Sequence, residues 1–175
     1  QKISRMYNKE IKIAIALIIL AYSIFLFNLG EIGYGIVVLI IMGIVILSIF
    51  KDERIVKAFY HLRKNDMQKA ASTLSKIKHP EKLIRSQEAY YYYLNGLILS
   101  QTQMNQSERF FKKALSIGLR TDTDKAVAKL NLAGLAMSRR KKREATTLIS
   151  EAKKLDKHNM LDEQLKMMKQ QLKRI

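Results

Sequence analysis

The chain has 175 residues and no cysteine, which excludes disulfides, thiolate metal sites and cysteine nucleophiles. Its 32 Lys and Arg residues against 15 Asp and Glu give a formal net charge of +17, which would attract anionic lipids, acidic proteins and nucleic acids alike. A solvated lysine-rich surface has the same excess, so charge alone identifies no partner.

Two apolar runs, residues 13–29 and 32–50, dominate the first part of the chain, and neither contains a charged residue. Each is about as long as a helix needs to cross the hydrocarbon core of a bilayer. Apolar residues occupy all sides of such helices, which disfavours the alternative of a buried hairpin in a soluble protein. Residues 13–50 are therefore predicted to form a transmembrane helical hairpin.

The first run follows a basic leader, so a cleaved signal peptide is a second interpretation, but no small-residue cleavage site follows it. Whether further residues precede Gln1 stays open. Lys and Arg lie in the basic segment 1–12 and directly after residue 50, whereas the turn between the runs carries only Glu31. By the positive-inside rule, we expect a two-span protein of the cell membrane with both termini in the cytoplasm.

Small residues recur along one side of each run, Gly35 and Gly43 in the second and Ala14 and Ala21 in the first. Such residues let two helices approach closely in lipid. We expect these four to carry the packing of the hairpin, although the same surface could instead receive a helix of a partner.

Residues 51–175 are predicted to form an all-α cytoplasmic domain, because apolar residues recur at helical spacing and Pro80 is the only proline. The expected helices are 53–64, 66–78, 81–102, 105–118, 123–139, 142–155 and 158–174. The first six form three antiparallel pairs joined by short turns. Thr121, Asp122 or Thr123 is expected to cap the fifth helix through a side-chain oxygen.

The second helices of the three pairs align at offsets of 37 and 38 residues. Three positions coincide in this alignment. They hold a small residue (Ala70, Ser107 and Ala145), a large apolar residue four positions later (Leu74, Phe111 and Ile149) and a third residue three positions after that (Ile77, Ala114 and Ala152). A structural repeat predicts that these positions are buried in every pair.

The pattern resembles the tetratricopeptide repeat family, whose unit is a helix–turn–helix of about 34 residues. The best match is residues 91–117, where Tyr91 and Leu94 stand for the aromatic and leucine of the first helix, and Ser107 and Phe111 for the small and aromatic residues of the second. The first unit matches poorly, since Ile77 replaces a small residue. The resemblance implies an α-solenoid of about three helix pairs. The last helix is expected to cap it, with a two-heptad dimer seam as the alternative.

Members of that family commonly bind peptides in a concave groove formed by the first helices of the pairs. The resemblance places the following residues there: Ile55, Phe59, Leu62, Arg63, Tyr92, Leu99, Leu130, Asn131, Met137 and Ser138. This surface is mostly apolar, so it is expected to bind an amphipathic helix or an extended apolar segment of a partner. Asp52, Ala89 and Val127 stand where a carboxylate clamp would need Lys, which does not support binding of chaperone tails.

Five adjacent cations, Arg139, Arg140, Lys141, Lys142 and Arg143, form the densest charge run of the chain. They are a candidate site for anionic inner-leaflet lipids or an acidic partner, with a merely solvated turn as the alternative. Another run, Tyr90 to Tyr93, cannot place four rings on one helix face, and Tyr91 with one neighbour is predicted to be buried.

The sequence contains no glycine-rich phosphate loop, nucleophile elbow or paired catalytic carboxylates, and His61, His79 and His158 are isolated from one another. We therefore predict no enzymatic activity, no cofactor and no metal. The expected function is a membrane-anchored adaptor or scaffold that assembles or regulates a partner membrane protein complex. The alternatives are a membrane-tethered binder of nucleic acid or anionic lipid, with nucleic acid the less favoured, and an accessory subunit of a membrane enzyme or transporter.

Overall fold

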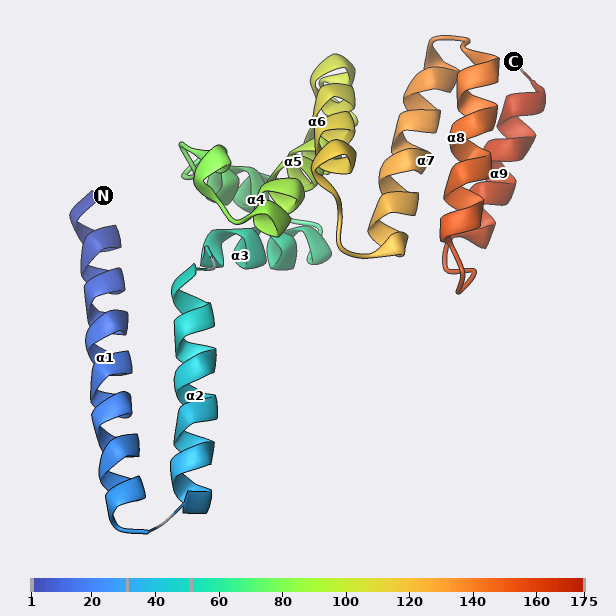
Figure 1. The fold of residues 1–175 in the computed structure, drawn as a ribbon. Helices are drawn as coiled ribbons and strands as arrows, with labels where there is room; N and C mark the ends of the chain where they lie inside the picture. The colour runs from blue at the N-terminus through green and yellow to red at the C-terminus, as the bar shows by residue number, and fades with distance from the viewer. Residues whose placement is uncertain (1, 31, 51, 175) are drawn as a thin grey trace. The chain divides into compact units, whose positions relative to one another are not determined.

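We describe the protein from a computed structural model, which describes the backbone of residues 2–30, 32–50 and 52–174 and the side chains of residues 13–30, 32–43 and 52–174. Within these residues the chain is all-α, as predicted, with nine α-helices that pack as sequential hairpins (Figure 1). It divides into two compact units, Gln1–Asp52 and Glu53–Ile175.

The first unit is a hairpin of α1 (Lys2–Asn28) and α2 (Ile32–Phe50), which pack along each other (Figure 1). The helices approach closely near the turn, where the buried Ser23 hydroxyl donates a hydrogen bond to the Gly35 carbonyl at 3.3 Å. A Cβ atom on Gly35 would lie 2.9 Å from the Phe27 ring, so a larger residue here would displace that ring. Gly35 thus belongs to the packing surface.

The other three residues expected at this surface do not carry the described packing. Ala14 and Ala21 are exposed on α1, and no described atom lies within 4 Å of a Cβ built on Gly43. The exposure of Ala14 and Ala21 is what the alternative, a surface that receives a helix of a partner, would require, so their role in packing stays a prediction. Ser23 and Phe27, larger residues that the sequence reasoning did not single out, fill the space opposite Gly35.

Large apolar side chains cover the described outer surface of the hairpin, and many are exposed, among them Leu17, Ile18, Phe25, Val37 and Ile40. In the part of the chain that the structure describes, no helix combines the length and the apolar character required to cross a membrane.

The second unit contains three helix hairpins in sequence, followed by a single helix (Figure 1). The helices are α3 (Glu53–Arg63) paired with α4 (Met67–Leu74), α5 (Arg85–Leu99) with α6 (Met104–Ile117), and α7 (Asp122–Ser138) with α8 (Lys142–Leu155), and then α9 (Asp162–Lys173). Consecutive hairpins meet where α4 contacts α5 and α6 contacts α7, and α9 packs on α8 and α7. The predicted order and pairing of the helices are confirmed.

Local side chains fix several helix ends. The Asp66 carboxylate accepts a hydrogen bond from the Lys69 amide and starts α4, and the Thr121 hydroxyl accepts one from the Asp124 amide at 3.1 Å and starts α7. Thr121 is thus the cap among the three candidates. The first and third hairpins both turn through a left-handed residue, Asn65 with φ 61° and Arg140 with φ 57°.

Two predicted boundaries are wrong because apolar residues outside the helices are drawn into the core. The third helix was expected from residue 81, but Pro80–Lys82 forms a separate 3₁₀ turn, η1, and Leu83 is extended and packs against the core before α5 begins. Likewise, α4 ends at Leu74 and not at residue 78, since Ile77 beyond its end is buried. Burial of these side chains outweighs continuation of the helix.

The last helix also begins later than predicted, at Asp162 and not at residue 158. The buried Asp156 carboxylate accepts hydrogen bonds from the backbone amides of Met160 and Leu161 at 3.0 and 2.8 Å, which holds the preceding segment in a turn. The apolar stripe of α9 faces the chain itself, with Leu161 and Leu165 buried and Leu172 partly buried. The dimer-seam alternative is wrong, because these side chains are used within the chain.

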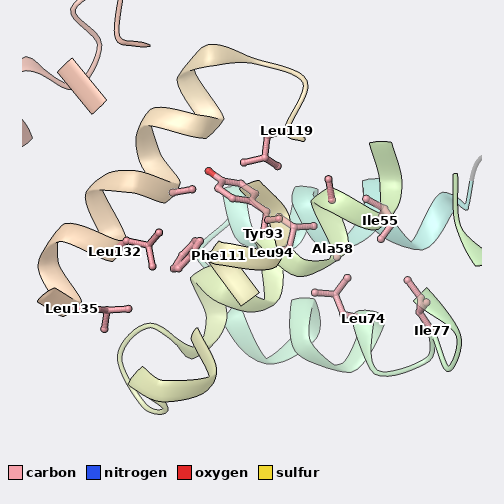
Figure 2. Close-up of a cluster of buried hydrophobic side chains, with 13 residues drawn as sticks. Ile55, Ala58, Leu74, Ile77, Tyr93, Leu94, Phe111, Leu119, Leu132 and Leu135 are labelled. Atoms are coloured by element: carbon pink, nitrogen blue, oxygen red, sulfur yellow. The ribbon is translucent and has the colours of Figure 1, made fainter. Parts of the chain in front are cut away.

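The repeat positions form the interior of the unit. All nine aligned residues, from Ala70 to Ala152, are at most 5% exposed, which confirms their predicted burial. Around Phe111 the first core cluster brings together α3, α4, α5, α6 and α7 (Figure 2), and a second cluster joins α7, α8 and α9. In the middle hairpin the Ser107 hydroxyl donates to the Gly96 carbonyl at 2.8 Å, and a Cβ on Gly96 would lie 3.0 Å from the Phe111 ring.

Candidate functional site

The residues predicted to line a groove differ widely in exposure. On α3, Phe59 and Arg63 are exposed, whereas Met137 on α7 is buried. Between these extremes are the half-buried residues Tyr92, Leu99 and Asn131. The six side chains therefore do not share one open surface.

The middle of the predicted groove is occupied by contacts within the chain. The Tyr92 ring lies 5.9 Å from the Phe110 ring, and the Lys113 ammonium lies 5.8 Å from the Tyr92 centroid. The Asn131 side-chain amide donates to the Val127 carbonyl at 2.9 Å. Tyr92 thus packs against α6, and Asn131 is bonded within α7, which leaves the two ends of the array as candidate binding surfaces.

A pocket of about 400 Å³ lies between α7 and the end of α9 and opens to solvent. It is lined by Gly134, Met137, Ser138, Gln171 and Arg174. The lining is mainly apolar and includes Met137, while Gln171 and Arg174 are the lining residues from the end of α9 whose side chains can donate hydrogen bonds. Such a combination suits a partner segment with an apolar side chain beside a carboxylate.

Sequence reasoning predicted Met137 and Ser138 for the binding surface but missed the contribution of α9. The apolar spacing of the last helix predicted a cap, and no binding role was predicted for its polar residues. The spacing of Gln171 and Arg174 could have indicated this contribution, because residues three apart lie on the same side of a helix.

The cation run is divided by its contacts. Arg139 is engaged with the preceding hairpin, since its guanidinium donates to the Glu108 carboxylate at 2.5 Å and to the Asn105 side-chain oxygen at 2.7 Å. Lys141 lies 3.5 Å from Glu144. Arg140, Lys142 and Arg143 are exposed. The run therefore joins two hairpins at one end and presents cations to solvent at the other.

Glu108 is the acidic centre of that joint. Lys112 donates a hydrogen bond to the Glu108 carboxylate at 2.6 Å. Lys112 and Arg139 together hold the pKa of the Glu108 carboxyl below its ordinary value of 4.5, although partial burial acts in the opposite direction. The carboxylate is therefore charged at neutral pH and bridges α6 to the end of α7.

A second joint connects α5 to the start of α7. The Tyr90 hydroxyl donates to the Asp124 carboxylate, and the Thr121 hydroxyl donates to the same carboxylate oxygen at 2.6 Å. Burial and the neighbouring Asp124 raise the pKa of Tyr90 to about 12. Tyr91 was predicted to be buried with one neighbour, but Tyr91 is half-buried and Tyr93 is the buried tyrosine of the run, because α5 turns residue 93 toward Phe111 in the core (Figure 2).

Within the described residues, no three His, Asp or Glu side chains are grouped as the ligands of a metal ion would be. Comparisons of the chain with family models, curated proteins and solved structures find no match. The candidate surfaces are therefore defined by the chemistry of their own residues.

Proposed function

We propose that this protein is a membrane-anchored adaptor of tetratricopeptide-like architecture that assembles or regulates a partner membrane protein complex. The observation that carries the proposal is the large exposed apolar surface of the α1–α2 hairpin, continuous in sequence with a stack of helix hairpins. Apolar surface in water is unfavourable by roughly 25 cal/mol per Å², so such a hairpin requires lipid or other apolar helices around it. The basic segments on either side of the hairpin favour a cytoplasmic location for both termini.

The tetratricopeptide-like part of the proposal is supported by the repeated burial pattern. Each hairpin of the second unit buries a small residue near the start of its second helix: Ala70, Ser107 or Ala145. Small residues at these positions let the paired helices approach closely, and the large residue four positions later fills the space beside them. An array of this kind offers an extended surface for binding, and binding at such a surface requires no catalytic residues.

The partner would bind at the pocket between α7 and α9. Its mainly apolar lining, with Arg174 among the lining residues, suits an amphipathic helix or an extended apolar segment carrying an acidic residue. Arg174 would pair with the carboxylate, while Met137 would contact the apolar side chain. The hairpin would bring the two proteins together in the same membrane.

The test is co-purification of the full chain from its native membrane in mild detergent. A stoichiometric membrane partner is expected with the unchanged protein and with the control Gln170→Ala/Lys173→Ala. At least about tenfold less is expected with Gln171→Ala/Arg174→Ala, because this change truncates two side chains that line the pocket. An enzyme or transporter among the recovered subunits would assign the adaptor to that complex. Recovery of the protein alone at native expression would count against the proposal.

The absence of cysteine makes the topology directly testable. In intact cells an impermeant thiol reagent should label Glu31→Cys but reach the exposed position of Gln106→Cys only after lysis. Labelling of the second variant in intact cells would contradict the cytoplasmic location.

A second candidate function, binding of an anionic partner at the cation run, is favoured by the backbone of Arg140. With φ 57° this residue occupies a left-handed conformation in which Gly or Asn is less strained. We infer that the exposed charge of Arg140 at this strained position has a use in binding. Salt-sensitive retention of RNA or DNA that is lost in Arg140→Gln/Lys142→Gln/Arg143→Gln would support nucleic-acid binding over the adaptor role.

A further inference from the structure

Helix α3 has two faces of different character. Ile55 and Ala58 are buried in the first core cluster. Farther round the helix, Val56 is 65% exposed and Tyr60 54%, and Phe59, which lies beside Ile55, is 40% exposed, although these are large side chains. Val56 and Tyr60 are one helical turn apart and share a side of the helix. Helix α3 therefore presents an apolar, partly aromatic face that no described side chain of the second unit covers.

Cations border this apolar face. Lys57, Arg63 and Lys64 are exposed, and the Lys64 ammonium lies 4.6 Å from the centroid of the Tyr60 ring. Lys57 lies 3.8 Å from Glu53, an exposed pair that is too weak to withhold the cation from another anion. Long cationic side chains beside tyrosine and aliphatic residues are typical of helices that lie in the headgroup region of a membrane.

The connection to the hairpin limits how far α3 can be from a membrane. Only residues 51 and 52 separate the apolar run 32–50 from Glu53, the first residue of α3. A fully extended chain spans at most about 3.6 Å per residue, so α3 begins within roughly 11 Å of the end of that run. If the run ends at the bilayer surface, the first turn of α3 starts in or beside the headgroup layer.

We propose that the exposed face of α3 is a binding site for the headgroup region of an anionic bilayer. Val56, Phe59 and Tyr60 enter the interface, while Lys57 and Lys64 contact lipid phosphates. The inference rests on the proposed function, because it requires the hairpin to lie in the same membrane. It adds a specific lipid-binding face and assigns Phe59 to lipid, not to the groove that the sequence predicted.

The chain contains no tryptophan, so a single introduced one reports on its own surroundings. The full-length protein carrying Tyr60→Trp is reconstituted into vesicles of phosphatidylglycerol and phosphatidylcholine, with brominated lipid as a contact quencher and acrylamide as an aqueous quencher. The reporter should be quenched by brominated lipid and shielded from acrylamide. Met160→Trp is the matched control, at a side chain 69% exposed in the same unit, and should respond only to acrylamide.

The contribution of charge is tested by adding Lys57→Gln, Arg63→Gln and Lys64→Gln to the Tyr60→Trp protein. Each cation near an anionic surface strengthens binding about fivefold at best, so the triple change lowers the ratio of bound to free α3 by up to about 100-fold. Quenching by brominated lipid should then fall toward that of Met160→Trp. The same fall is expected for the Tyr60→Trp protein in vesicles of phosphatidylcholine alone.

The outcomes separate this inference from the proposed function. An Ile18→Trp protein whose reporter escapes brominated lipid would overturn both, because the hairpin would not lie in the membrane. Quenching of that reporter by lipid, with the Tyr60→Trp reporter open to acrylamide, would overturn only the α3 site. Shielding of the Tyr60→Trp reporter without lipid quenching would also overturn it, since another protein surface would then cover α3.

Discussion

The close contact between α5 and α6 at Gly96 makes a quantitative prediction. An alanine Cβ at this position would lie 3.0 Å from two atoms of the Phe111 ring, and that ring is completely buried. The change Gly96→Ala should gain about 1 kcal/mol from helix propensity, and overpacking should cost about 1–3 kcal/mol. We expect the free energy of unfolding to fall by about 1 kcal/mol as the net result.

Gly134 provides the matched control, since it occupies the interior of α7 in the next hairpin. Its Cβ would lie 3.8 Å from the Met168 methyl group, an ordinary contact. Gly134→Ala should therefore stabilise the domain by up to about 1 kcal/mol. The two glycine-to-alanine changes thus differ by about 2 kcal/mol, although the residues exchanged are identical.

Urea unfolding of the full chain in mild detergent, followed by far-ultraviolet circular dichroism, measures both changes. Repeating Gly96→Ala in a Phe111→Leu background removes the ring that the new methyl group meets, and the cost of the alanine should then vanish, with an interaction energy of about 1–2 kcal/mol. If Gly96→Ala stabilised the protein as much as Gly134→Ala, the inferred packing of α5 on α6 would be refuted.

Three further predictions concern the joints between elements. Thr121→Ala should destabilise the domain by about 1 kcal/mol through loss of the α7 cap, and Thr123→Ala by much less, as denaturant midpoints would record. The pKa of Glu108 in the folded protein lies below 4.5, so its contribution to stability is present above about pH 4.5 and is lost as the pH falls through the folded pKa. Glu108→Gln should therefore flatten the acid side of a curve of unfolding free energy against pH. An unchanged curve would argue against the contact of Glu108 with Lys112 and Arg139. Tyr90→Phe should cost about 1.5–3 kcal/mol by removing a hydrogen bond to a carboxylate, with calorimetric unfolding as the measurement.

The helical part of the fold follows from the sequence because its determinants are local. Apolar spacing defined the helices, and the offset between Ala70, Ser107 and Ala145 identified positions that are buried in every hairpin. Boundaries were less predictable wherever a distant contact decided them. Leu83 leaves the helical conformation to pack on the core, and no neighbour in the sequence indicates this.

The candidate site was predicted less well, since the availability of a side chain depends on other elements. Arg139 and Arg140 are adjacent in one cation run, yet the first is held by Glu108 across the hairpin boundary and the second is exposed. Tyr91 and one neighbour in its run were expected to be buried, whereas the orientation of α5 buries Tyr93 and leaves Tyr91 half-buried. Composition and spacing give the residue types of a surface but not the neighbours that cover it.

The position of each hairpin in the array explains where open surface remains. The first helix of a hairpin packs against the second helix of the same hairpin and against the neighbouring hairpins. Its exposed area therefore depends on where its hairpin lies in the array. Helix α7, with a hairpin before it and α9 after it, buries eight side chains, whereas α3, the first helix of the unit, buries two. The middle of the predicted groove is correspondingly half-buried, and binding is expected at the ends: a lipid surface at Val56 and Tyr60, and a protein segment beside Met137. An adaptor arranged in this way would contact the membrane through α3 and would contact its partner protein through α7 and α9.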